Sequence, residues 1–171
     1  MTSTGPAISV APQRLSLAEA AAAIRMGSMT SELLMQSYLQ RINKRDATVG
    51  AWAQLDAEKA LAMAREKDTQ DCMGPLHGVP IGVKDVIETA GMATRYGSPI
   101  YDNHVPALDA ACVASLRKAG AIIIGKTVTA EFATYHPGRT ANPLNPKHTP
   151  GGSSSGSAAA VADFQVPAAL G

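Results

Sequence analysis

The sequence is poor in cysteine, in aromatic residues and in long apolar runs. Its 171 residues include two cysteines, and aromatic residues make up 4% of the chain. Cys72 and Cys112 lie far apart and outside any C-x-x-C pattern, which argues against a disulfide framework and against a structural zinc site. We therefore expect two reduced thiols and no bound metal.

The chain also lacks a charge excess and a stretch that could cross a membrane. Fifteen basic residues oppose fourteen acidic ones, so no overall field attracts nucleic acid or anionic lipid. The start has neither the basic region nor the apolar region of a secretory signal. We expect a cytoplasmic protein, with 46% hydrophobic residues to build a core, that binds a small molecule.

Residues 1–72 are predicted to be mainly helical. Ser16 can begin a first helix with a capping box, and Thr30 or Ser31 can cap a second helix that carries an apolar stripe. Asp56 can begin a third helix, with alanines on one face and charges on the other. These helices have the pattern of packing elements.

Residues 73–171 show strands alternating with helices. A β-branched run over 81–87 predicts a strand that enters a loop, and Asp109 can cap a helix that ends at Gly120. The apolar run over 121–125 predicts a buried strand. This alternation is typical of an α/β sheet domain.

Residues Gly120–Thr127, GAIIIGKT, match the phosphate-binding pattern G-x-x-x-x-G-K-T, so a nucleotide hydrolase is one hypothesis. The context argues against it, because a phosphate-binding loop needs a turn where residues 121–124 have the composition of a strand. We expect Lys126 instead to be a solvated lysine at the end of that strand.

A second lysine, Lys84 in GVPIGVKDVI, has apolar neighbours at Ile81, Val83 and Val86. Removal of an ammonium group from water lowers its pKa, which a lysine needs in order to accept a proton near neutral pH. The alternative is a surface lysine paired with Asp85, and this segment alone favours that alternative because lysines are seldom buried.

The segment TPGGSSSGSAAAVA places several serines in a glycine-rich turn before a helix of small residues. A flexible tether would not run directly into an apolar helix, so a tight loop at a helix start is expected. In such a loop, N–H groups and hydroxyls gather around a small volume, as acyl transfer requires. The alternative is a serine that caps a buried helix.

Several segments in order, MTSELLMQSYLQRI, GPLHGVPIGVKD, GAIIIGKTVTAEFA and NPLNPKHTPGGSSSGSAAAVA, resemble the amidase signature family. The resemblance implies an α/β fold in which helices flank a mixed β-sheet. Residues 1–171 would form the amino-terminal part of a single amidase domain, with 1–72 as its helical region and 73–171 as the start of an α/β core that is incomplete at the carboxyl end.

The resemblance also implies catalytic roles for Lys84 and Ser153. Lys84 would be the base, and Ser153, which in the family follows a cis peptide bond, would relay a proton from a second serine that attacks the carbonyl. Ser154, Gly151 and Gly152 are candidates for supporting roles. Such a Ser-Ser-Lys triad hydrolyses amides through an acyl-enzyme and uses no cofactor.

In the family, the nucleophile lies in a G-T-x-T-G-G-S-like segment that begins at the residue corresponding to Gly171. The attacking serine and the oxyanion donors are therefore expected beyond Gly171, and the 171-residue chain is expected to be inactive alone. Val128 departs from the asparagine common at its position. A small-molecule amide is the expected substrate, and a homodimer is possible. Two alternatives stay open: a truncated relative that binds without catalysis, and the nucleotide hydrolase.

Overall fold

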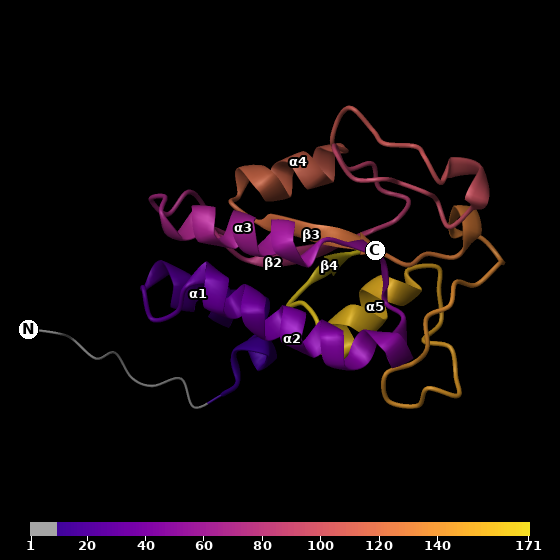
Figure 1. Ribbon diagram of the computed structural model, residues 1–171, viewed down its shortest axis with the longest axis horizontal. Helices are drawn as coiled ribbons and strands as arrows, with labels where there is room; N and C mark the ends of the chain where they lie inside the picture. Colours follow the sequence, from indigo (N-terminus) through magenta and orange to yellow (C-terminus); the bar gives the residue numbers. More distant parts are fainter. Residues whose placement is uncertain (1–9) are drawn as a thin grey trace, which may run out of the picture.

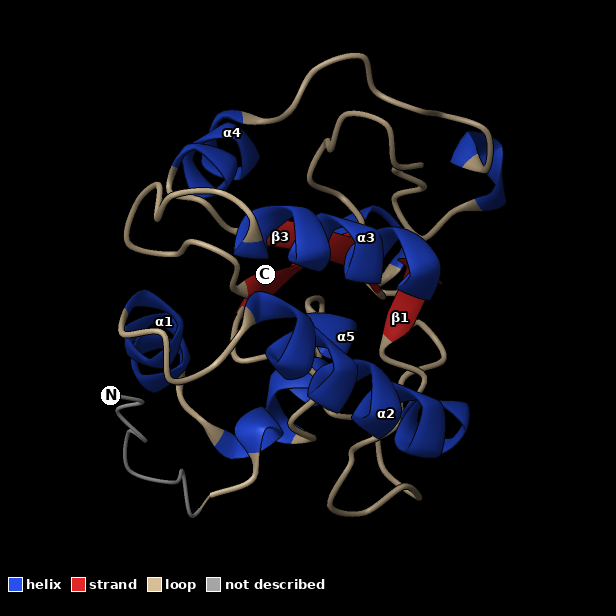
Figure 2. Cartoon of the chain, turned by 60° about the vertical axis from the view of Figure 1, so that its left-hand side comes forward, coloured by secondary structure: helices blue, strands red, loops and turns tan. Residues whose placement is uncertain are grey.

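The computed structural model describes residues 10–171. Helices lie on both faces of one four-stranded sheet (Figures 1 and 2): α4 lies on one side of the strands, and α2 and α5 lie on the other. The α-helices are α1 Leu17–Arg25, α2 Ser31–Val49, α3 Ala57–Asp68, α4 Ala111–Lys118 and α5 Ser155–Ala162. The strands are β1 Trp52–Leu55, β2 Pro80–Lys84, β3 Ile122–Thr127 and β4 Ala169–Leu170. The 3-10 turns are η1 Pro12–Arg14, η2 Pro99–Tyr101 and η3 Glu131–Ala133.

The starts of the first three helices are capped by the residues that the sequence indicates. Ser16 and Glu19 form a reciprocal capping box at α1, and the Thr30 side chain accepts a hydrogen bond from the backbone of Leu33 at α2. Asp56 caps α3 in the same way. Each cap satisfies an N–H group that has no partner within the helix.

Asp109 does not cap α4, contrary to the prediction. Its Oδ1 accepts from the backbone N–H of Ala90 at 2.8 Å, and its Oδ2 accepts from Arg117 Nε at 2.9 Å. The residue before α4 is Ala110, which offers no side-chain cap. Asp109 instead ties the loop after β2 to the last turn of α4, a tertiary contact that local sequence does not reveal.

The sheet has the order β1-β3-β2-β4 and is mixed, in agreement with the fold class that the resemblance implies. Strand β1 pairs with β3 antiparallel, whereas β2 is parallel to both β3 and β4. The predicted strand over 81–87 ends at Lys84, and β1 lies in a region predicted to be mainly helical. None of the helices in residues 10–171 is long and apolar enough to cross a membrane.

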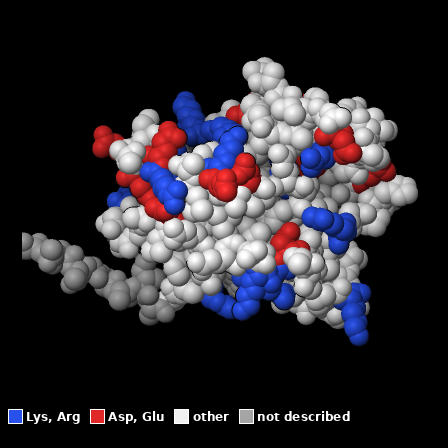
Figure 3. Space-filling model, viewed as in Figure 1, with Lys and Arg blue, Asp and Glu red and all other residues white. Residues whose placement is uncertain are grey.

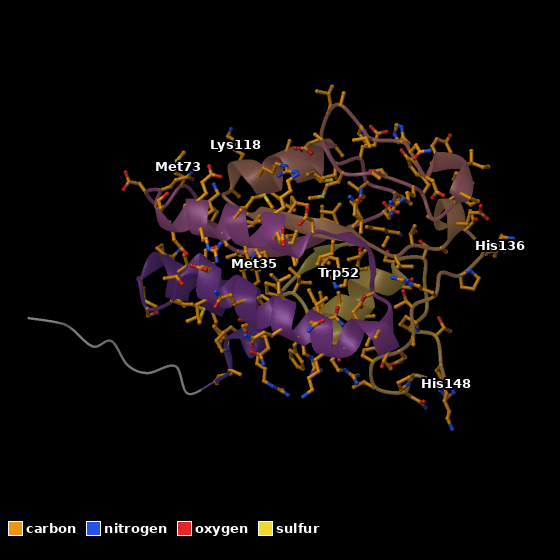
Figure 4. The ribbon with its side chains drawn as sticks, viewed as in Figure 1. Met35, Trp52, Met73, Lys118, His136 and His148 are labelled. Carbon is orange, nitrogen blue, oxygen red and sulfur yellow. The ribbon has the colours of Figure 1, made fainter. Side chains whose placement is uncertain are left out.

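The core occupies both faces of β3. Ile122 and Ile124 pack with Met35 and Trp52 in one cluster, whereas Ile123 packs in a second cluster that includes residues of β2 and α4. Figure 4 shows Met35 and Trp52 in the interior, while His136 and His148 project from loops. On the face drawn in Figure 3, basic and acidic side chains are interspersed, as expected from the near-zero net charge.

The expectation of a solvated Lys126 is wrong. Lys126 is 0% exposed within β3, and its Nζ donates to the carbonyl of Ile87 and to Thr94 Oγ1 at 2.8 Å. Thr89 Oγ1 at 3.3 Å and Asp85 Oδ1 at 3.8 Å complete its surroundings. The loop that follows β2 folds over β3 and covers the ammonium group with these oxygen atoms.

Candidate active site

Lys84 is the last residue of β2 and is 6% exposed. Its Nζ lies 2.7 Å from Ser153 Oγ and 2.8 Å from Ser154 Oγ, both just before α5. The expected proximity of Lys84 to the glycine-serine loop is therefore found. Packing of α5 against the sheet brings together two segments that are 69 residues apart in the chain.

The electrostatic surroundings of Lys84 favour its neutral form. Burial lowers the pKa of Lys84, because its ammonium form loses contact with water. No ion pair joins Lys84 to an acidic side chain within residues 10–171. The Asp85 carboxylate lies nearer to Lys126, so the alternative of a surface pair between Lys84 and Asp85 is wrong.

The loop before α5 is shaped by two glycines. Gly151 has a φ of 87°, in the left-handed region that favours glycine, and the peptide bond from Gly152 to Ser153 is cis. The carbonyl of Ser153 accepts from the backbone N–H of Ala130 at 3.0 Å, which anchors the loop to the chain after β3. Apart from chain neighbours, no atom lies within 4 Å of the position that a Cβ would take at Gly151 or Gly152.

That open space belongs to a cleft of about 300 Å³ beside the Ser153 loop. Its walls come from the segment after β3, from the glycine turn and from the first residue of α5. The lining residues are Ala130, Thr134, Tyr135, Pro137, Gly138, Thr149, Gly151, Gly152 and Ser155. The cleft is large enough for a small ligand to reach the loop that holds Ser153.

Small residues in α5 allow it to lie directly on the sheet. A Cβ at Gly156 would collide with the carbonyl of Ala51 and the backbone nitrogen of Val128, so only glycine fits there. The Gly156 N–H donates to Val128 O at 2.9 Å across the same contact. This close approach holds the start of α5 near the carboxyl end of β2, where Lys84 is the last residue. It thereby positions Ser153 and Ser154, which precede α5, beside Lys84.

Gly171 lies beside the side chain of Ser154. Gly82 pairs with Ala169 and Val83 with Leu170 in parallel register, so Lys84 and Gly171 are the next residues along their two strands. A Cβ at Gly171 would lie 3.0 Å from Ser154 Oγ. The side chain of Ser154, one of the two hydroxyl groups that contact Lys84, therefore occupies the space beside the Gly171 α-carbon.

The sequence did not indicate a pair of buried hydroxyl groups near this site, those of Thr127 and Ser157. Thr127 Oγ1 and Ser157 Oγ lie 2.7 Å apart, and Ser157 Oγ donates to the carbonyl of Leu170 at 2.7 Å. Thr127 is the register partner of Lys84 in the neighbouring strand. Thr127 is the last residue of the GAIIIGKT segment. The sequence motif does not show that Thr127 pairs with Lys84 in the neighbouring strand, and this pairing is what places it near the site.

The structure excludes the phosphate-binding hypothesis for Gly120–Thr127. The segment 122–127 is a continuous strand, and a phosphate needs the converging N–H groups of a loop followed by a helix. Lys126 Nζ is also fully enclosed by oxygen atoms of the 85–94 loop. It cannot reach a ligand at the surface.

The sheet is mixed, and it brings a buried lysine to a glycine-serine loop. Both features agree with the amidase signature family that the sequence motifs resemble. The chain belongs to the amidase family, because the family model described as Amidase matches residues 33–171. The glutamyl-tRNA(Gln) amidotransferase subunit from Roseiflexus sp. (strain RS-1) is 43% identical over 167 residues, and the same subunit from Lachnospira eligens is 44% identical over 163 residues. These alignments cover 92% and 90% of the chain.

Solved structures show the same relationship in three dimensions. The peptide amidase of Stenotrophomonas maltophilia superposes with a TM-score of 0.84 at 38% identity over 91% of this chain, and a fatty acid amide hydrolase with 0.86 at 26% identity over 94%. The chain spans about a third of the proteins it matches: 34% of both curated relatives, 35% of the peptide amidase and 30% of the fatty acid amide hydrolase. The predicted family and fold class are thereby confirmed.

Proposed function

We propose that the protein formed by this chain and the residues that follow Gly171 hydrolyses amide bonds through an acyl-enzyme. Residues 1–171 would be the amino-terminal part of its single amidase domain, of which residues 1–9 lie outside the described region. Lys84 would act as the base and Ser153 as the proton carrier. The contact of 2.7 Å between Lys84 Nζ and Ser153 Oγ is the observation that supports this proposal, because proton transfer requires hydrogen-bond distance.

A neutral lysine has two N–H donors and one lone pair, and Lys84 has two hydroxyl neighbours at hydrogen-bond distance. If one N–H of Lys84 donates to Ser154 Oγ, the lone pair is free to accept the proton of Ser153. Ser154 would then orient the base without taking part in proton transfer. The lowered pKa of Lys84 favours the neutral form that this arrangement requires.

The nucleophile of the proposed reaction is a serine beyond Gly171. Its proton passes to Ser153 while the proton of Ser153 passes to Lys84, and its oxygen attacks the amide carbon. Collapse of the tetrahedral intermediate breaks the C–N bond, and the departing nitrogen takes a proton back through the same relay. Water then hydrolyses the acyl-enzyme. Because the side chain of Ser154 lies beside Gly171, the residues that follow Gly171 would begin next to this pair.

The substrate is proposed only as a class, a small-molecule amide bound in the cleft beside Gly151 and Gly152. The similar proteins include a peptide amidase, a fatty acid amide hydrolase and one component of an amidotransferase. All three names indicate chemistry at an amide group, but each name refers to a different compound. The proposed steps use side chains and water, so they need no cofactor and no nucleic acid at the site.

The experiment is an assay of the full-length gene product for release of ammonia or amine from a panel of simple amides. The proposal expects turnover that Lys84→Ala abolishes and that Lys118→Ala, on the exposed end of α4, leaves unchanged. A protein that binds amides but never turns them over would support the alternative of a noncatalytic relative. Turnover that survives Lys84→Ala would overturn the assignment of the base.

A further inference from the structure

We propose that Ser157, supported by Thr127, is a positioning residue that fixes the end of β4 and thereby places the chain after Gly171 against Lys84. This inference rests on the proposed function, because it concerns the segment expected to supply the nucleophile. It adds a requirement beyond the lysine and the two serines: a hydroxyl pair to which Lys84 Nζ makes no hydrogen bond.

The hydrogen bonds of this pair have a defined direction. Ser157 has one hydroxyl proton, and that proton is directed to the carbonyl of Leu170 at 2.7 Å. The 2.7 Å contact between Ser157 and Thr127 must then be a hydrogen bond that Thr127 donates. The resulting chain runs from Thr127 in β3 through Ser157 in α5 to Leu170 in β4, and it connects three elements that are distant in sequence.

Burial makes this chain sensitive to the loss of any member. Thr127 is 0% exposed and Ser157 is 5% exposed, so water cannot easily replace a lost hydrogen bond. Removal of the Ser157 hydroxyl would leave the Leu170 carbonyl and the Thr127 hydroxyl without this partner. The buried Thr127 hydroxyl would then need another acceptor, and the Leu170 carbonyl would lose the side-chain bond that ties β4 to α5.

Strand β4 is short and pairs with β2 alone within residues 10–171. It comprises only Ala169 and Leu170, with two register pairs to β2, and Gly82 N donates to Ala168 O at a long 3.2 Å. The bond from Ser157 is a side-chain hydrogen bond to the last carbonyl of this strand. It therefore fixes the peptide that joins Leu170 to Gly171.

That peptide leads directly to the proposed catalytic pair. A Cβ at Gly171 would lie 3.0 Å from Ser154 Oγ and 3.8 Å from the Ser157 Cβ, so both side chains lie beside the backbone at this residue. A displacement at Leu170 would be transmitted to Gly171 and to the residues after it. Misplacement of reacting groups by about 1 Å can reduce a rate on the order of a hundredfold.

The test uses the full-length protein and compares hydroxyl removals inside and outside this chain of bonds. Ser157→Ala and Thr127→Val break the chain, and Thr127→Ser keeps the hydroxyl. Ser31→Ala and Thr140→Val are matched controls, because both hydroxyls are buried and donate to backbone carbonyls, those of Gly78 and Gly50, at 2.6 and 2.9 Å, and neither belongs to the chain of bonds through Ser157. The measurements are kcat, KM and the rate of covalent labelling by a fluorophosphonate, all well below the melting temperature.

We expect kcat and the labelling rate to fall roughly tenfold to a hundredfold in Ser157→Ala and less in Thr127→Val, with little change in KM. Thr127→Ser should stay near the unmodified protein. The controls should lose thermal stability but retain kcat. Equal kcat in Ser157→Ala and Ser31→Ala, in a protein whose turnover depends on Lys84, would overturn this inference alone. Absence of Lys84-dependent turnover would overturn the proposed function and this inference with it.

Discussion

The Nζ atom of Lys84 lies 2.7 Å from the Oγ atom of Ser153, although 69 residues separate them in the chain. Lys84 ends a strand, and Ser153 precedes a helix whose glycine and alanines pack closely on that sheet. Burial lowers the pKa of the lysine, and the lysine has no acidic partner among residues 10–171. Burial therefore favours the neutral amine of Lys84, the form that the proposed proton transfer from Ser153 requires.

Replacement of either member of this pair should remove most of the amidase activity of the full-length protein. We expect Lys84→Ala to lower kcat by about a thousandfold or more and Ser153→Ala to remove most activity, since a positioned general base contributes on the order of 10²–10⁴-fold. Lys84→Arg should fail as well, because a guanidinium keeps its proton. Steady-state assays of folded variants test this, with Lys118→Ala as control. An active Lys84→Arg variant would contradict a role in proton transfer.

Activity should rise with pH in the range where Lys84 loses its proton. Only the neutral amine can accept a proton from Ser153, so kcat/KM should be low below the pKa of Lys84 and reach a plateau above it. Because burial lowers this pKa, the midpoint should lie below the ordinary lysine value of about 10.4. A pH-rate profile of the full-length protein measures it. A kcat/KM that falls as the pH rises from about 6 to about 9 would oppose the assignment.

Local signals in the sequence predicted the starts of the first three helices and the character of most elements. Ser16, Thr30 and Asp56 cap helices where their side chains suggest, because a cap depends only on a few neighbouring residues. The motifs around Lys84 and Ser153 identified two segments that the fold brings together. The family resemblance, rather than composition or spacing, supplied the reason to connect them.

Features that depend on tertiary packing could not be predicted from the sequence. Lys126 follows an apolar strand, and nothing local shows that the 85–94 loop folds over it with three oxygen partners. Asp109 was assigned to the nearest helix, whereas its partners are Ala90 and Arg117. The bond from Ser157 to Leu170 requires that β4 lie beside β2, and strand order cannot be read from such a short strand.

Lys126→Ala should destabilise the protein, because Lys126 is buried and not solvated as the sequence suggested. Its removal leaves the buried Asp85 carboxylate and the hydroxyl of Thr94 without their ammonium neighbour. Loss of one partner of a buried ion pair costs about 3–5 kcal/mol. Urea unfolding of the full-length protein measures the loss. The double variant Asp85→Asn with Lys126→Met should lose less stability than the sum of the losses in the two single variants, Asp85→Asn and Lys126→Met. Losses that simply add would show that Asp85 and Lys126 are not coupled.

The stability of the unmodified protein should increase as the pH rises above about 8. Burial lowers the pKa of Lys126 to about 8, although Asp85 opposes this shift. Between this value and the unfolded value of about 10.4, the unfolded state binds more protons, so the free energy of unfolding grows with pH, by roughly 3 kcal/mol at most. Urea titrations across this range test the slope. The double variant without Lys126 should lose this contribution, and an identical slope in both proteins would rule out Lys126 as its source.

The isolated chain of residues 1–171 should hydrolyse no amide and should associate through β4. Activity fails because the proposed nucleophile and oxyanion donors lie beyond Gly171. Association follows from the two edges of the sheet. At β1, the Ala51 carbonyl accepts from the backbone N–H of Val128, which follows β3, so the next carbonyl, that of Trp52, faces the outer edge, where it accepts from the Arg139 side chain at 2.7 Å. At β4, no strand within residues 10–171 pairs with the side away from β2, and an unpaired edge recruits other strands.

Ala169→Pro provides a direct test of the β4 edge. Ala168 O points to β2, where it accepts from Gly82 N, and the N–H of Ala169 on the same planar peptide must point the opposite way, to the open edge. Proline removes this outward N–H and leaves the bond to Gly82 in place. The unmodified isolated chain should elute as a dimer or larger species in size-exclusion chromatography with light scattering, and Ala169→Pro should shift it toward monomer. Association that is unaffected by this change would place the contact elsewhere, and amide turnover by the isolated chain would refute the placement of the nucleophile beyond Gly171.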